Sequence, residues 1–205
     1  MTTHRRRALA ALATVPAGAA LASLQGCVPL LLAHQVKAAS VAAAEARGVK
    51  PANFKLTAAH VLWMDPPAIP YEIEYKTSRY AIDKNPTQLE QQTGRDYVDA
   101  LLALYRANGP SFATQELASA GVPDGTPYLI VLTPTRGAVS VVGGHCTMTV
   151  RVAIRGARGQ ELQAMEVDSR SGWQPQGSPK EPELLVVRNF AKAMVKGFRD
   201  ATLIA

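Results

Sequence analysis

Cysteine and catalytic motifs are scarce in this chain of 205 residues. The two cysteines, Cys27 and Cys146, are far apart, so no Cys-x-x-Cys pair exists, and no two histidines have the His-x-x-x-His spacing. Both absences argue against a zinc site and predict that the protein holds no metal. The chain has no Gly-x-Ser-x-Gly elbow, and the double glycine Gly143-Gly144 lacks the Lys-Ser/Thr of a phosphate loop. We therefore expect no cofactor and no nucleophilic triad.

Charged residues are also few, at 19% of the chain against 47% apolar residues. This composition excludes collagen-like, coiled-coil and disordered chains and fits one compact domain. The 22 Lys+Arg and 16 Asp+Glu give a formal charge of +6, to which Arg5, Arg6 and Arg7 contribute three charges. Without these three, 19 basic minus 16 acidic residues leave +3. A charge this modest disfavours a nucleic-acid partner.

The first 26 residues have the layout of an export signal. The three arginines precede an uncharged, alanine-rich stretch from Ala8 to Leu24, which ends at Leu24-Gln25-Gly26-Cys27. A branched apolar residue three before a cysteine, with a small residue directly before it, resembles the lipobox of bacterial lipoproteins. The resemblance implies cleavage between Gly26 and Cys27, a lipid thioether on Cys27 and further fatty acyl chains such as palmitate. Such chains hold a protein to a bilayer without a transmembrane helix.

Other interpretations of this segment stay open. No charged residue occurs between Ala8 and Val36, so the segment could also be an uncleaved membrane anchor, or Cys27 could lie in the core of an N-terminal helix. The arginines resemble a twin-arginine export signal as well as an ordinary secretory one. Both export routes place the protein in the cell envelope. Val28 follows the cysteine where an aspartate would favour inner-membrane retention, so we expect the outer membrane.

The sequence predicts three parts of the chain. Residues 1–26 form the signal peptide, residues 27–53 the lipidated N-terminus and a tether, and residues 54–205 the folded domain. The tether interpretation rests on the alanine-rich stretch from Leu30 to Arg47, which has no strong apolar periodicity.

Periodicity and turn signals predict an α+β or α/β domain with a mixed, mostly antiparallel sheet and helices packed on one face. A helix is predicted to begin at Asn85-Pro86 and to end at Asn108-Gly109-Pro110. The other predicted elements are strands at 54–64, 71–76 (an edge or a long loop), 128–133, 138–142, 147–155 and 161–168, a hairpin turn at 156–159, a loop at 171–182, and helices at 114–120 and 183–203.

The order of these elements, with Gly159-Gln160-Glu161-Leu162 at the hairpin turn, is similar to that of small periplasmic domains of outer-membrane accessory lipoproteins. These include lipoproteins that assist curli secretion or activate penicillin-binding proteins. The resemblance implies a protein-binding role without catalysis.

Two groups of residues in the domain could carry chemistry. His145-Cys146 combines a thiol with an imidazole, but neighbours in a strand point to opposite faces. We expect Cys146 to be a buried single thiol, with a nucleophile or an interchain disulfide as the alternatives. Four arginines around the last hairpin either form a cationic face for an anionic glycan or lipid headgroup, or keep the edge soluble. They are Arg151, Arg155, Arg158 and Arg170.

The sequence therefore predicts a non-enzymatic, membrane-anchored envelope lipoprotein that binds another envelope component. A lipid- or small-ligand-binding lipoprotein with an apolar cleft between the sheet and the C-terminal helix is the alternative. An envelope hydrolase is a third hypothesis.

Overall fold

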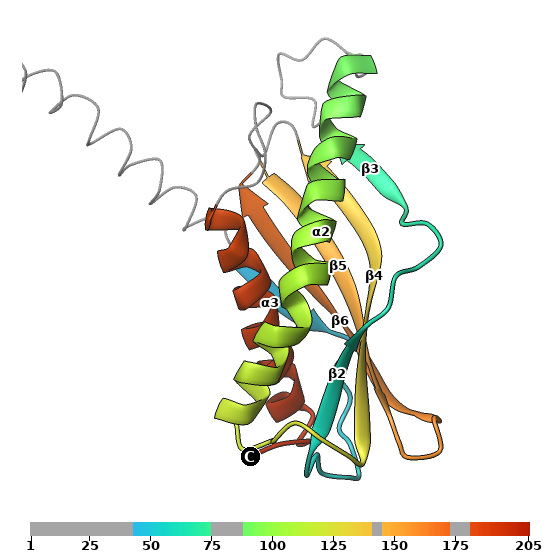
Figure 1. Cartoon of the computed structure of the whole chain (residues 1–205), viewed down its shortest axis with the longest axis vertical. Helices are drawn as coiled ribbons and strands as arrows, with labels where there is room; N and C mark the ends of the chain where they lie inside the picture. Colours follow the sequence, from blue (N-terminus) through green and yellow to red (C-terminus); the bar gives the residue numbers. More distant parts are fainter. Residues whose placement is uncertain (1–42, 75–87, 141–144, 173–180) are drawn as a thin grey trace, which may run out of the picture. The chain divides into compact units, whose positions relative to one another are not determined.

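The computed structural model describes residues 43–74, 88–140, 145–172 and 181–205 (Figure 1). These residues form a mixed sheet of six strands with two helices on one face, which confirms the predicted fold class. The strands are β1 (Ala43–Arg47), β2 (Ala59–Trp63), β3 (Tyr71–Glu74), β4 (Tyr128–Ser140), β5 (His145–Arg155) and β6 (Glu161–Gly172). The helices are α2 (Gln88–Ser119) and α3 (Glu181–Asp200).

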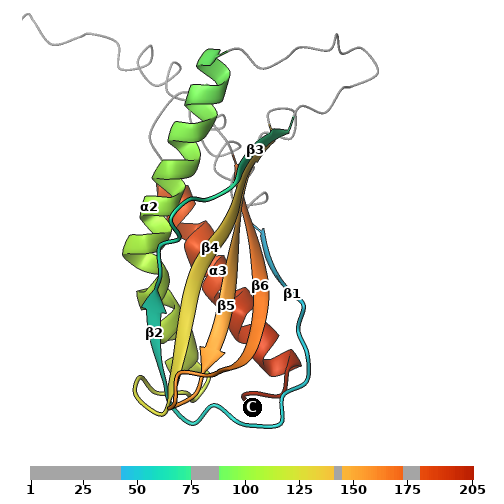
Figure 2. The ribbon, with the colours of Figure 1, turned by 90° about the vertical axis from the view of Figure 1, so that its right-hand side faces the viewer.

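The strand order in the sheet is β1-β6-β5-β4-β2, and β3 pairs with the same side of β4 as β2 does (Figure 2). β1, β6, β5 and β4 pair in antiparallel fashion, whereas β2 and β3 run parallel to β4. The tight hairpin between β5 and β6 turns at Gly159, whose φ of +77° suits glycine. The hairpin turn is as predicted, and β5 and β6 contain the strands predicted at 147–155 and 161–168. The loop predicted at 171–182 is too long, because residues 171 and 172 belong to β6 and residues 181 and 182 to α3.

A proline divides the edge beside β4 into two strands. Leu132 accepts a hydrogen bond from the N–H of Met64 at 2.9 Å, so its backbone points toward β2. Two residues on, Pro134 points the same way but has no N–H to donate. Pairing resumes where Gly137 donates to the Pro70 carbonyl at 3.0 Å. The segment between these bonds leaves the sheet, and we call residues 65–70 the strap.

The sequence-based boundaries of several elements differ from those of the structure. The residues of β1 were expected in the tether, but they pair with β6, so the sheet begins at Ala43 rather than near Phe54. The strands predicted at 128–133 and 138–142 are one strand, β4, with a bulge after Pro134. The predicted helix start at residues 85–86 lies outside the described residues.

Helix α2 continues through Pro110, although its end was predicted at Asn108-Gly109-Pro110. Proline removes one helical hydrogen bond, a loss that local sequence rules treat as a helix end. Continuation buries Ala113 and Leu117, which are almost fully inaccessible to solvent. Gly109 lies near the Trp63 ring, since a Cβ at this position would be 3.7 Å from it. Tertiary packing thus outweighs the local signal, and the two predicted helices are one.

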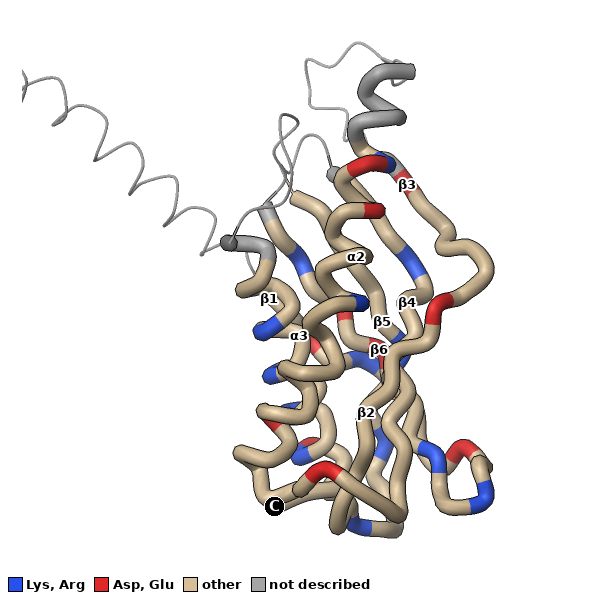
Figure 3. Tube along the Cα trace, viewed as in Figure 1, with Lys and Arg blue, Asp and Glu red and all other residues tan. Residues whose placement is uncertain are grey.

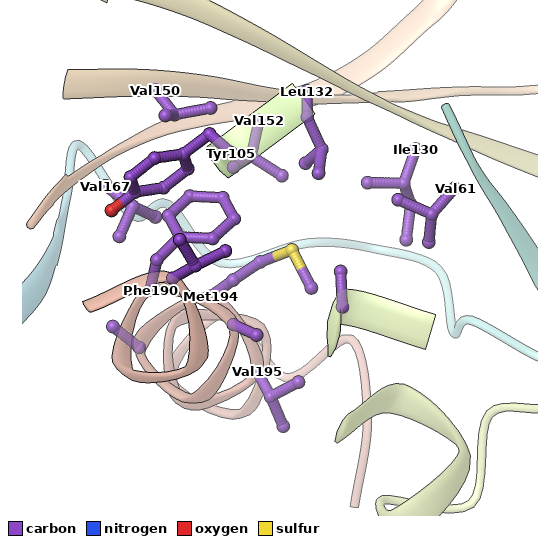
Figure 4. Packing of buried hydrophobic residues seen from close by; sticks show 14 of the residues in the cluster. Val61, Tyr105, Ile130, Leu132, Val150, Val152, Val167, Phe190, Met194 and Val195 are labelled. Carbon is purple, nitrogen blue, oxygen red and sulfur yellow. The ribbon is translucent and has the colours of Figure 1, made fainter. Parts of the chain in front are cut away.

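The core lies between the helices and one face of the sheet (Figure 4). α3 contributes Phe190 and Met194, and the sheet contributes alternate valines such as Val150 and Val152. Tyr105 of α2 meets Phe190 edge-on, with ring centroids 5.5 Å apart. Side chains therefore fill the space between the sheet and the C-terminal helix, where the small-ligand hypothesis expected a cleft.

Candidate functional site

The lipobox residues Leu24, Gln25, Gly26 and Cys27 lie outside the described residues, and so does the whole predicted signal peptide. Neither helix in the described part of the chain has the length and apolar character needed to cross a bilayer. The membrane anchor therefore stays a prediction from the sequence.

The four arginines of the predicted cationic face come partly together. Arg151 and Arg155 of β5 and Arg170 of β6 point away from the helices, on what we call the open face of the sheet, whereas Arg158 lies in the exposed hairpin turn. Arg151 forms an ion pair with Glu161 at 2.6 Å. The acidic residues come from β6, where Glu166 is paired in register with Arg151 of β5, and both charge signs are seen along the sheet (Figure 3). The surface is therefore mixed in charge.

Further ion pairs join neighbouring strands on the open face. Asp168 of β6 pairs with Arg47 of β1 and accepts a hydrogen bond of 2.7 Å from the Thr149 hydroxyl. At the opposite edge, Arg136 of β4 pairs with Glu72 of β3. These contacts tie the short edge strands β1 and β3 to the central strands.

Cys146 is a buried free thiol, as predicted. Its side chain lies on the helix-covered face, whereas the neighbouring His145 is only partly buried and points to the other face. Desolvation raises the pKa of the Cys146 thiol to about 12. A thiol that is protonated and inaccessible to solvent is unsuited to nucleophilic attack.

Polar side chains in the core are few and mostly paired. The Tyr105 hydroxyl is hydrogen-bonded to Ser169, which also donates to the Met148 carbonyl at 3.1 Å. Burial raises the pKa of Tyr105, an effect larger than the opposing effect of its hydrogen bond with Ser169. Ser171 is also buried, and its hydroxyl has no hydrogen-bond partner among the described residues. This cluster stabilises the helix–sheet contact and faces no opening.

A shallow groove lies between the strap and one side of α2, with a volume of about 430 Å³. Its lining combines apolar side chains, such as Ile69 of the strap and Leu102 of α2, with the charged Arg95 and Asp99 of α2. Asp65 closes one end, where it accepts hydrogen bonds from the Trp63 indole at 2.8 Å and from Arg106 at 3.1 Å. These bonds, first that of Trp63 and then that of Arg106, lower the pKa of Asp65. Sequence reasoning did not predict the groove, because α2, a distant part of the chain, forms its other wall.

The described residues offer little for metal or acid–base chemistry. Within 43–74, 88–140, 145–172 and 181–205, no three His, Cys, Asp or Glu side chains gather at metal-binding distance. His60 contacts Asp124 through Nδ1 at 2.9 Å, but both side chains are more than half exposed. We find no nucleophile beside this pair in the described ranges.

Comparisons with known proteins yield only distant structural similarity. No family model and no curated protein matches the sequence. Two solved structures are similar, both of PelC from Paraburkholderia phytofirmans and both dodecamers: one is 13% identical with a TM-score of 0.37, and the other is 14% identical with a TM-score of 0.38. Each similarity covers 75% of this chain and 96% of the PelC chain. Values this low do not assign the chain to a family.

Proposed function

We propose that this protein is a non-enzymatic lipoprotein of the bacterial cell envelope, anchored by lipid on Cys27, whose domain binds another envelope component. The observation that carries the proposal is the sequence Leu24-Gln25-Gly26-Cys27 after a basic start and an apolar stretch. The outer membrane is the expected location, because Val28 follows the lipidated cysteine.

The domain supports this proposal by what it leaves accessible. Both helices cover the same face of the sheet, so the open face and two strand edges meet solvent within the described part of the chain. Cys146 is buried and its pKa is raised, so the thiol nearest to a histidine does not serve as a nucleophile. An accessible sheet and an unreactive thiol are more compatible with binding than with covalent catalysis.

Labelling with a radioactive fatty acid tests the anchor. The wild-type chain is expected to carry label and to sediment with membranes, and Cys27→Ala is expected to lose both properties. Cys146→Ala is the matched control, because it removes the other cysteine and should keep the label. A Cys27→Ala chain that is still labelled and still membrane-bound overturns the anchor. Membrane binding of the wild type without label favours the uncleaved anchor instead.

The groove beside α2 favours a second candidate function, the binding of a lipid or another small ligand. Its volume of about 430 Å³ lies within the usual range of small-molecule sites. The expected place of this site therefore moves from α3, where Phe190 and Met194 fill the space, to α2 and the strap. Native mass spectrometry of the purified full chain should show a co-purified ligand whose amount falls in Leu102→Trp. A ligand-free wild-type chain contradicts this candidate.

A further inference from the structure

The outer edge of β2 has backbone groups that point away from the sheet. In a parallel pair, alternate residues of a strand bond to a given neighbour. Met64 donates to Leu132 of β4, so by this alternation the backbone of Leu62 also faces β4. The N–H and C=O groups of Val61 and Trp63 therefore point to the opposite side. Among the described residues, no strand lies on that side of β2.

The side chains on this edge are apolar where soluble edge strands usually carry charge. Leu62 and Met64 point to the open face, and they are 44% and 39% exposed. They account for two of the three exposed large hydrophobic residues in the described part of the chain. Edge strands normally avoid pairing through charges, prolines or bulges. β2 has no proline or bulge between Ala59 and Trp63, and its one polar side chain, His60, is paired with Asp124 near the start of the strand.

The other edge of the sheet is protected differently. β1 places Glu45 and Arg47 toward the open face, and Arg47 is paired with Asp168. An added strand beside β1 would have to pass these charges, whereas one beside β2 would meet Leu62 and Met64 and, at the start of the strand, His60 with its partner Asp124. β2 is therefore the edge that favours an additional strand.

The helices determine what kind of strand could be added. α2 packs behind β2 and α3 packs behind β1, so each edge strand has a helix beneath it (Figure 2). If a second copy paired with β2 and kept its helices on the same face of the sheet, its own helix would lie beside α2, directly behind the joined strands. A single extended segment carries no helix beneath it and has room beside β2.

We propose that the β2 edge binds an extended segment of a partner polypeptide, which adds to the sheet as a further strand. The segment bonds through its backbone to Val61 and Trp63 and places uncharged, apolar side chains, at every second residue, beside Leu62 and Met64. Pairing ends at the Pro66-Pro67 step of the strap at one end of β2. At the other end the N–H of Ala59 is bonded to Pro123. This inference rests on the proposed function, since it gives the chemistry by which the envelope partner is recognised.

Photo-cross-linking in cells tests the surface first. Leu62 and, as a matched control, Leu162 are each replaced by p-benzoylphenylalanine in the full-length chain. Leu162 is 37% exposed and lies at the hairpin between β5 and β6, away from the β2 edge. Irradiation should give an adduct with a second polypeptide at position 62 and none at position 162. The adducted partner segment is then identified by mass spectrometry and synthesised as a peptide.

The synthetic peptide tests the mode of binding to the purified full chain. It should slow amide hydrogen exchange at Val61 and Trp63. Only alternate N–H groups of the added peptide face β2. N-methylation of those residues should therefore weaken binding about tenfold or more, whereas N-methylation of the residues between them should weaken it little. Leu62→Lys should also weaken binding about tenfold, whereas Leu162→Lys should leave it unchanged.

Each contrary result has a distinct meaning. Lack of an adduct at position 62 overturns the β2 surface, whether or not position 162 gives one, and leaves the proposed partner-binding function standing, because the two positions probe only these two surfaces. An adduct at position 62 with a second copy of the chain overturns the choice of occupant. Strand addition is overturned if the peptide leaves hydrogen exchange at Val61 and Trp63 unchanged. It is also overturned if peptides N-methylated at either set of alternate positions bind equally well.

Discussion

The two faces of the sheet are built from the same strands yet differ in almost every property. In β5, Val150 and Val152 point to the helices and are fully buried, whereas Thr149 and Arg151 point to the open face and remain partly exposed. The period of two along a strand makes this division possible. The helix-covered face thus provides stability by packing, and the open face is free to carry charge and contact other molecules.

Close packing on the helix-covered face also depends on residues that are small. A Cβ on Gly137 of β4 would lie 2.6 Å from a Val98 methyl of α2. A Cβ on Gly197 of α3 would lie 2.8 Å from that of Ala46 in β1. The open face has buried apolar residues too, such as Val131, and neither α2 nor α3 covers them. Long charged side chains on adjacent strands can cover such residues with their aliphatic parts.

The largest expected effect comes from a cavity in the helix-covered face. Phe190→Ala removes a fully buried ring that packs edge-on against Tyr105. We expect the free energy of unfolding to fall by about 3–5 kcal/mol. Urea denaturation of the full chain in detergent measures this. The control, Leu162→Ala, removes a side chain that is 37% exposed and should cost less than about 1 kcal/mol. Similar losses for the two variants would contradict the contrast between the faces.

A smaller effect, again from the helix-covered face, depends on pH. Burial raises the pKa of Cys146 from 9.0 to about 12, so the folded state favours the neutral thiol. The contribution of the neutral Cys146 thiol to the free energy of unfolding is complete below pH 9 and is lost as the pH rises toward 12. Between these values the unfolded state can ionise while the folded state does not, which costs about 1.4 kcal/mol for each pH unit.

Cys146→Ala tests this pH dependence. The variant should be less sensitive than the wild type to an increase from pH 8 to pH 10.5, as measured by urea denaturation at each pH. Tyr105 is common to both chains, so its titration cancels in the comparison. Parallel curves for the two chains would show that burial of the thiol does not govern the pH dependence.

The sequence was sufficient to predict features that depend on local periodicity. The alternation in residues 147–155 and the apolar stripe of the last helix correctly indicated β5 and α3. The burial of Cys146 was expected on another ground, because an unpaired thiol outside the cytoplasm is usually buried, and the structure confirms it. Features that depend on distant packing could not be predicted. The alanines of β1 resemble a tether until Gly197 of α3 is seen to approach Ala46 closely. Likewise, a proline in α2 resembles a helix end until Trp63 is seen against Gly109.

The candidate sites follow the same rule. The four arginines were recognisable from the sequence, but their pairing was not, because Arg151 meets Glu161 across a hairpin. The strap and the β2 edge depend on Pro134, which lies in a different strand and stops the pairing of the edge. Only the three-dimensional arrangement links such residues, so neither the groove nor the free edge had a signal in one sequence.

The smallest expected effect tests the open face. The ion pair of Arg151 with Glu161 has an N–O distance of 2.6 Å, but both side chains are about 40% exposed, at 39% and 41%. Water and salt screen such a pair, so a double-mutant cycle with Arg151→Ala and Glu161→Ala should give a coupling of about 0.2–1 kcal/mol that falls as salt is added. A coupling above about 2 kcal/mol, or one insensitive to salt, would mean that the open face is covered in the native protein. That result would place a binding surface over Arg151 and would erase the contrast in exposure between the two faces.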